Sequence, residues 1–282
     1  MVLAAVDSLI IATEFSPWVV AVGAVLAGFG AGVLSALLGI GGAIVTTPAV
    51  RALGATPIES IGSTVPAILP GAISGAYRYA KEGLVEWRLA LSLGAAGAAF
   101  SVLGAWTSGE VNGRMLMVLT AAVMLWAGIS VVWKLRRTTP DTRMEEDPGK
   151  DAVTVRNSIP ALGGLGALAG FVAGLLGVGG GIVLVPVLTG PLRVPMRRAV
   201  ASSLVAVAIF QVPALITHVW LGHVNWAFAI PIMIGVIPGA QVGAHLTVGA
   251  SDRTIRILFG ILVMVIAVVY GATEVRGLVV NG

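Results

Sequence analysis

Long apolar segments separated by short polar stretches run along the whole chain. About 20 apolar residues cross the hydrocarbon core of a bilayer as a helix, and several segments approach or reach that length. The segments fall near residues 18–38, 42–54, 60–77, 88–107, 114–134, 160–176, 179–192, 199–217, 226–248 and 255–273. This pattern predicts an all-α polytopic membrane protein.

One polar interruption, at residues 136–157, is stronger than all the others. It contains ten of the 30 charged residues, of which 17 are basic and 13 acidic, together with two prolines. Such a composition is typical of a solvated linker. We therefore predict a first transmembrane repeat at 1–135, a cytoplasmic linker at 136–157 and a second transmembrane repeat at 158–282.

The two halves carry nearly the same glycine-rich motif. Residues 37–48 read LLGIGGAIVTTP, and residues 175–186, which lie 138 positions later, read LLGVGGGIVLVP. After one inserted residue the offset becomes 139, and the pair at 63–64 (ST) then matches the pair at 202–203 (SS). Matches that keep a constant register over this distance indicate an internal duplication.

Basic residues exchange places between the two halves. Residues 77–88 carry three Lys or Arg, whereas the corresponding segment 217–228 carries none. Residues 191–199 carry three Arg, whereas the corresponding segment 51–62 carries one. Because Lys and Arg favour cytoplasmic loops, we expect the halves to be inverted relative to each other, as in many secondary transporters.

Inversion requires an odd number of segments in each half. A chain reversal at each glycine motif supplies the extra segment, which gives five segments per half. Both termini are then extracytoplasmic, and the basic residues face the cytoplasm except for Arg51, Arg114 and Arg276. The segments at 42–54 and 179–192 are too short to span roughly 30 Å at about 1.5 Å per residue, so we expect broken or half-length helices there.

The glycine motif has the features of an anion site. Glycine permits the positive φ angles of a tight reversal, and a helix that restarts after the turn directs free N–H groups and a positive dipole end into the break. Two such breaks near the midplane would bind a small anion without a charged side chain. The alternative is that the glycines only allow close helix packing. The motif residues assigned to the site are Gly39, Gly41, Gly42, Ala43, Gly177, Gly179, Gly180 and Gly181.

Polar side chains near the motifs are further candidates for the substrate site. Gln211 and Gln241 lie in apolar segments, where a buried amide either joins helices or lines a path, and Ser35 precedes the first motif. Hydroxyl groups can donate to an oxyanion, although membrane hydroxyls also bond carbonyls of their own helix. The hydroxyl candidates are Thr46, Ser63, Thr64, Ser202 and Ser203.

Composition narrows the classes of function. Only 11% of the residues are charged and the mean hydropathy is +0.98, against about 25% charged in soluble domains. The chain has no cysteine, and no hydrolase motif or metal-ligand cluster is present. We therefore expect no enzyme activity, no cofactor, no metal and no nucleic-acid partner. The three histidines are expected near segment ends, with proton coupling as a minor alternative.

The duplicated LLG(I/V)GG(A/G)xxxxP motif, the two polar pairs and the PGAQVGA segment at 238–244 resemble the TauE/SafE family of membrane anion transporters. The resemblance covers essentially the whole chain outside the linker. It implies a multi-pass protein of the cell (inner) membrane that transports sulfite, sulfoacetate or other organosulfonates, with export as the expected direction. Ala43 departs from the second copy, which has Gly181, so the first turn is expected to be less open.

Three functions fit these observations. The favoured one is a secondary transporter of a small anion, which works by alternating access around a midplane site at the two broken helices. The alternatives are an anion channel with the same site, and a membrane scaffold or assembly factor in which the glycines are structural. The sequence leaves a homodimer open and does not identify the exact substrate or a coupling ion.

Overall fold

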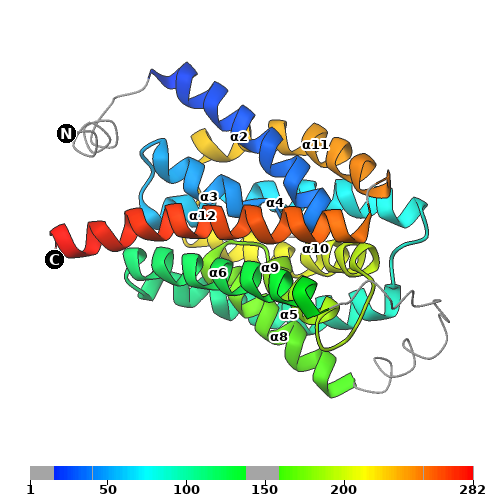
Figure 1. Cartoon of the computed structure of the whole chain (residues 1–282). Helices are drawn as coiled ribbons and strands as arrows, with labels where there is room; N and C mark the ends of the chain where they lie inside the picture. The colour runs from blue at the N-terminus through cyan, green and yellow to red at the C-terminus, as the bar shows by residue number, and fades with distance from the viewer. Residues whose placement is uncertain (1–15, 40, 138–158, 250, 282) are drawn as a thin grey trace.

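The computed structural model describes residues 16–39, 41–137, 159–249 and 251–281, so nearly all of the predicted linker lies outside the described residues. The described part contains helices and no strand, which confirms the all-α prediction. Of the described helices, five precede the linker and five follow it, and Figure 1 shows how they are arranged. They are α2 (Pro17–Leu38), α3 (Ala43–Ala52), α4 (Pro57–Lys81), α5 (Trp87–Glu110), α6 (Gly113–Arg137), α8 (Ile159–Leu176), α9 (Gly181–Thr189), α10 (Met196–Trp220), α11 (Trp226–Gly249) and α12 (Asp252–Asn281).

Helices α4 and α10, which occupy the same place in the two repeats, run antiparallel through the centre of the bundle. The N–H group of Asn225, just after α10, donates to Ser63 Oγ near the start of α4 at 2.9 Å. In the same way, the N–H group of Glu86, just after α4, donates to Ser202 Oγ near the start of α10 at 3.0 Å. The end of each helix therefore lies beside the start of the other.

The outer helices pack across the boundary between the repeats. Helix α2 packs along α11, and α8 packs along α5, while α6 and α12 pack together. Glycines allow this close approach, since a Cβ on Gly32 would collide with the Val236 carbonyl and one on Gly170 would collide with the Gly97 carbonyl. Such small-residue contacts are typical of membrane helices, and they make the two repeats a single interlocked body.

The outer surface of the bundle is apolar. In the described part, helices α2, α5, α6, α10 and α11 are each long and apolar enough to cross a membrane. Large side chains on their outer faces are exposed, among them Trp18, Ile234 and Trp220, the last to 83%. An apolar surface of this extent is stable in lipid and would aggregate in water. The protein is therefore a multi-pass membrane protein.

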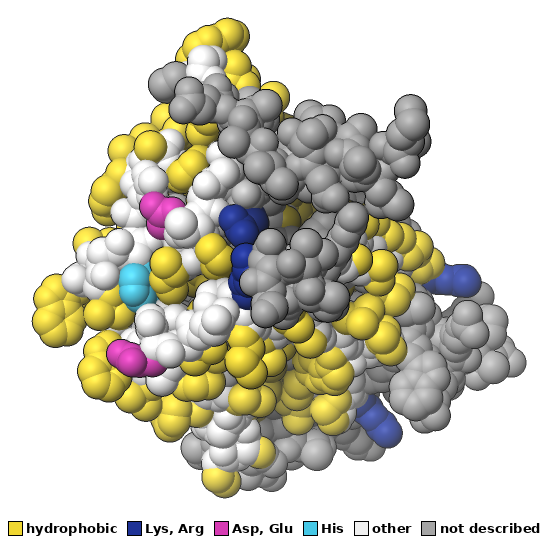
Figure 2. Space-filling view, turned by 90° about the vertical axis from the view of Figure 1, so that its left-hand side faces the viewer, with side chains coloured by type: hydrophobic (Ala, Val, Ile, Leu, Met, Phe, Trp, Pro, Cys, Tyr) yellow, Lys and Arg dark blue, Asp and Glu magenta, His cyan; other side chains and the backbone are white. Residues whose placement is uncertain are grey.

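Polar side chains from different repeats meet at one end of the bundle. Arg198 Nη1, near the start of α10, lies 3.4 Å from Glu86 Oε1, and Arg78 Nη2, near the end of α4, lies 3.5 Å from His245 Nδ1. Helix α2 begins and α12 ends at the opposite end, on the left in Figure 1. Figure 2 looks onto that opposite end and shows a few charged side chains scattered among apolar and uncharged groups.

Candidate functional site

Both glycine motifs interrupt a helix, as predicted. The chain leaves α2 at Leu38 and starts α3 at Ala43, and it leaves α8 at Leu176 and starts α9 at Gly181. Glycine adopts a left-handed φ at little cost, which explains why the motif contains so many glycines. The glycines of the two breaks all have φ between 51° and 82°: Gly39, Gly41, Gly42, Gly177, Gly179 and Gly180.

At the first break the chain turns back along the helix it has just left. A Cβ on Gly42 would lie 3.2 Å from the carbonyl oxygen of Ala31 in α2. At the end of α3, the Cδ2 atom of Leu53 is 3.5 Å from the position that a Cβ on Gly23 would take. Gly23 lies near the start of α2. Helices α3 and α9 have ten and nine residues, which confirms the expectation of half-length helices after each motif.

The two breaks meet at the centre of the protein. A Cβ on Gly41 would lie 3.3 Å from Gly179 Cα, so the turns from the two repeats are in van der Waals contact. Their described residues are buried, and no side chain caps the start of α3 or α9. Two uncapped helix N-termini, each with a positive dipole end, therefore lie close together in a place shielded from solvent.

A hydroxyl group of each repeat contacts a backbone carbonyl in the glycine break of the other repeat. Ser203 Oγ donates to the carbonyl of Gly39 at 3.0 Å, and Thr64 Oγ1 approaches the carbonyl of Gly177 at 3.5 Å. Each hydroxyl is also 2.9 Å from the carbonyl three residues earlier in its own helix. The structure thus brings Thr64 and Ser203 to the breaks, in contacts that stabilise the turn.

The remaining hydroxyl candidates are also engaged with backbone groups. Ser63 Oγ accepts a hydrogen bond from the loop N–H group that follows α10, and Ser202 Oγ accepts one from the loop N–H group that follows α4. Thr46 Oγ1 lies 3.5 Å from the carbonyl of Gly42 in its own turn. Thr46 is buried one turn into α3, so it lies near the first break. Ser63 and Ser202 primarily position the loops between long helices.

The two glutamine candidates lie in different surroundings. Gln211 on α10 is fully buried, and neither atom of its side-chain amide has a hydrogen-bond partner among the described residues. Gln241 is exposed on the outer face of α11, in the stripe that includes Ile234 and Ile237. The structure therefore does not bring Gln241 to the breaks, because its position on α11 faces outward.

The antiparallel register of α4 and α10 places Gln211 at the level of the breaks. Leu204 of α10 lies against Gly75 of α4, with its Cδ1 3.0 Å from the Cβ position of that glycine. Because the two helices are antiparallel, moving seven residues forward along α10 from Leu204 to Gln211 corresponds to moving seven residues back along α4 from Gly75 to Ile68. Gln211 is therefore at the same depth as Ile68. The Cγ2 atom of Ile68 lies 3.2 Å from the Cβ position of Gly41. By this register, a buried, unpaired amide lies at the depth of the two helix N-termini in the bundle.

A second unpaired polar atom lies beside the first break. Ser35 Oγ in α2 is buried without a partner among the described residues, and its Cβ is 3.3 Å from the Cβ position of Gly42. Leaving a buried polar group unpaired costs about 1–3 kcal/mol, and such exceptions in a native structure require an explanation. Among the described residues, both Gln211 and Ser35 therefore keep unused hydrogen-bonding capacity.

Sequence reasoning missed one pair of contacts next to the breaks. Tyr79 Oη donates to the carbonyl of Ala36 at 2.6 Å, and His218 Nε2 lies 2.9 Å from the carbonyl of Gly174. Both carbonyls are in the last turn before a break, where helical N–H partners run out. His218 was expected near a segment end with an interfacial role, and it is fully buried because it completes this contact. The repeat offset pairs Tyr79 with His218 and was the available signal.

The fold and the paired breaks define a class, namely the polytopic membrane transport proteins that have discontinuous helices at their centre. The sequence comparison then gives the family. The model of the Sulfite exporter TauE/SafE family matches residues 24–270, and the chain belongs to this family. Its relatives are named as probable membrane transporters, and membership of this family makes the protein a membrane transporter and not an enzyme.

Several curated relatives are named as membrane transporters. A "Probable membrane transporter protein" of Xylella fastidiosa (strain Temecula1) is 30% identical over 247 residues, which cover 86% of this chain and 90% of that protein. The "Probable membrane transporter protein YunE" of Bacillus subtilis (strain 168) is 25% identical over 256 residues, 86% of this chain and 94% of that protein. No solved structure matches the chain significantly.

Proposed function

We propose that the protein is a secondary transporter that binds a small anion where the two glycine breaks meet. The contact between Gly41 and Gly179 carries this proposal, because it brings together two buried helix N-termini that no side chain caps. Free N–H groups and aligned peptide dipoles favour negative charge. The site therefore selects an anion without placing a costly cationic side chain within the membrane.

Gln211 completes this site in the proposal. Its amide offers two donors and one acceptor, and no described group uses any of them. An oxyanion such as sulfite or a sulfonate presents several acceptor oxygens, so it can accept from the amide and from the backbone at the same time. The family name and the motifs of the chain favour sulfite, sulfoacetate or another organosulfonate as the substrate.

Inverted repeats supply the alternating access in this proposal. The antiparallel arrangement of α4 and α10 is what inversion of the repeats requires. The breaks are buried from solvent in this conformation, as expected for a closed state between inward-open and outward-open forms. We place the basic end of the bundle in the cytoplasm and both termini outside the inner membrane. Export of an anion is then favoured by about 2.3 kcal/mol per charge per 100 mV.

The test compares the same substitution at two glutamines. In proteoliposomes, Gln211→Leu is expected to reduce sulfite or sulfoacetate flux about tenfold or more, since a hydrogen bond to a charged group contributes about 1.5–3 kcal/mol. Its thermal stability should stay equal or rise, because the unpaired amide is removed. Gln241→Leu, on the outer face of α11, is the control and should transport like the wild type.

The result also separates the proposed transporter from its alternatives. Wild-type flux in Gln211→Leu would contradict the assignment of the site. Saturable flux with exchange of labelled for unlabelled anion supports a carrier, whereas single-channel currents would identify a channel. A membrane scaffold with structural glycines would show neither flux nor thermal stabilisation by sulfite or sulfoacetate.

A further inference from the structure

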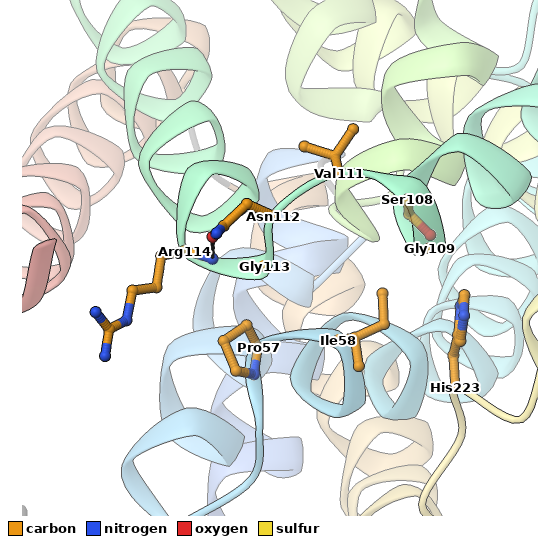
Figure 3. A pocket seen from close by; sticks show the side chains of 9 residues that line it. All are labelled: Pro57, Ile58, Ser108, Gly109, Val111, Asn112, Gly113, Arg114 and His223. Atoms are coloured by element: carbon orange, nitrogen blue, oxygen red, sulfur yellow. Dashed lines mark hydrogen bonds between the residues drawn. The ribbon is translucent and has the colours of Figure 1, made fainter. Parts of the chain in front are cut away.

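A pocket opens at the end of the bundle that lies away from the basic segments. The start of α4, the end of α5, the start of α6 and the loop after α10 enclose a volume of about 500 Å³. In Figure 3, His223 rises from the loop after α10 toward Ser108 and Gly109 at the end of α5. Its Nε2 atom lies 3.3 Å from the Cβ position of Gly109, and both residues line the pocket.

His223 connects the pocket to the helix that precedes the second break. Its Nδ1 atom lies 3.1 Å from Nδ1 of His218, and His218 Nε2 lies 2.9 Å from the carbonyl of Gly174. Gly174 is in the last turn of α8, just before the break that starts at Gly177. A continuous chain of hydrogen bonds therefore runs from the pocket to this break.

The hydrogen bonds fix which nitrogen atoms carry protons. A carbonyl oxygen only accepts, so His218 Nε2 must carry a proton, and the Nδ1 atom of neutral His218 is an acceptor. His223 Nδ1 must then donate to it. In the neutral pair, the unprotonated nitrogen left over is His223 Nε2, which is the atom at the pocket.

This arrangement accepts one proton and resists a second. The first added proton binds His223 Nε2 and leaves both hydrogen bonds intact. A second proton would have to bind His218 Nδ1, where it would break the bond between the rings. It would also create two cations with ring centroids 5.3 Å apart. The pair therefore changes its charge by one, and the charge develops at the pocket.

We propose that the His218–His223 pair is a single-proton binding site, and that the charge it acquires binds a small anion in the adjacent pocket. This inference rests on the proposed transport function only in placing the pocket on the path of the anion. Protonation and anion binding are then linked, because each favours the other. The pocket would serve as the binding site for an oxyanion at one end of the path.

The charged groups around His223 leave it without a carboxylate counter-ion among the described residues. On α4, Glu59 is engaged by the Thr56 cap and lies 3.4 Å from Asn225 Nδ2, and Glu110 at the end of α5 is exposed. On α6, Arg114 lines the pocket, with its guanidinium directed away from His223 in Figure 3. No carboxylate forms an ion pair with His223 within the described ranges. Partial burial lowers the pKa of His223, and a bound anion would raise it again.

The first repeat provides a natural comparison that lacks the proton site. There, Tyr79 makes the equivalent bond to the carbonyl of Ala36, and Leu84 occupies the position that corresponds to His223. The double substitution His218→Tyr with His223→Leu therefore copies the first repeat. It is designed to keep a donor for the Gly174 carbonyl while it removes both titrating rings.

The proton site is tested by nitrogen-15 NMR of histidine-labelled full-length protein in lipid nanodiscs. At about pH 8 we expect His218 as the Nε2–H tautomer and His223 as the Nδ1–H tautomer. On acidification to about pH 5, only His223 should take up a proton. Sodium sulfate, whose charge is constant over this range, should raise the pKa of His223, whereas the same concentration of sodium gluconate should not.

Three outcomes would overturn this inference. They are a His223 ring that stays neutral throughout, full protonation of both rings, and a pKa of His223 that sulfate leaves unchanged. The double variant His218→Tyr with His223→Leu should lack the proton uptake, and His223→Leu alone checks this result if the double variant does not fold. None of these readouts requires transport, so failure here leaves the transport site standing, and failure of the Gln211 test leaves the proton site standing.

Discussion

The two repeats build their breaks with the same contacts and differ in the chemistry placed around them. In both, a glycine turn ends a long helix, a hydroxyl from the other repeat approaches its carbonyl, and a ring donates to the last helical turn. The contacts are reciprocal, since each repeat supplies the groups that hold the other. The shared features are therefore those that form and support the breaks.

The differences concern polar side chains that the scaffold does not require. The second repeat has Gln211, where the first has Ala72, and this amide is buried without a described partner. The second repeat also has His223, where the first has Leu84. A symmetric scaffold alone would treat both membrane faces alike. In the two proposals above, these differences supply a distinct substrate site and a titratable group at one end of the transport path only.

The largest expected effect is a difference in stability loss when equivalent glycines of the two breaks are replaced by alanine. A Cβ on Gly180 would lie 2.5 Å from Phe210 Cζ and 2.8 Å from the Ala169 carbonyl, whereas one on Gly42 would meet nothing closer than 3.2 Å. Gly42→Ala should cost about 1–2 kcal/mol for its left-handed φ. Gly180→Ala should cost a further 1–3 kcal/mol from overpacking. Thermal unfolding in detergent measures both variants, and equal losses would show that the second break relaxes as easily as the first.

The next comparison concerns the rings that anchor the helix ends. Tyr79→Phe leaves the carbonyl of Ala36 without its donor and should cost about 1–3 kcal/mol. His218→Phe should cost a similar amount through the carbonyl of Gly174. His218→Tyr should cost less than His218→Phe, because Tyr restores a donor of the kind that the first repeat uses. A His218→Tyr variant as unstable as His218→Phe would break the proposed equivalence of the two anchors.

A smaller effect is expected at the loop-holding serines. Ser63→Ala and Ser202→Ala each remove the acceptor of one loop N–H group, at 2.9 and 3.0 Å. Each substitution should cost about 0.5–1.5 kcal/mol, and the two values should agree because the contacts are equivalent. Both variants should keep the substrate preference of the wild type. A change of preference in only one of them would indicate that this serine also contacts the anion.

The smallest effect is a dependence of stability on pH. Burial lowers the pKa of His223 in the folded state, so the unfolded chain binds its proton first as the pH falls below about 6.5. The contribution of this residue to stability is therefore complete above that pH and is lost as the pH falls toward the folded pKa. His223→Leu should show a weaker acid destabilisation than the wild type in thermal melts. An identical pH profile would remove the support that burial gives to the proton site.

Much of the backbone architecture could be predicted from the spacing of residues. The repeated glycines predicted both breaks, because glycine adopts the positive φ angles of a tight reversal at little cost. The apolar segments predicted the remaining helices for the same physical reason, namely the length needed to cross lipid. The assignment of polar side chains was less successful. Gln211 and Gln241 are alike in sequence, since each interrupts an apolar run, yet one is buried and the other faces outward.

The sequence by itself determined the helical class, the duplication, the position of the breaks and the family. These properties depend on the length of apolar segments and on local backbone freedom, and both are set by residues that are close together in the sequence. The tertiary structure alone decided that Gly41 meets Gly179, that Gln211 has no described partner and that His218 contacts His223. Such contacts join residues from different helices, and their geometry depends on how the helices pack and face each other.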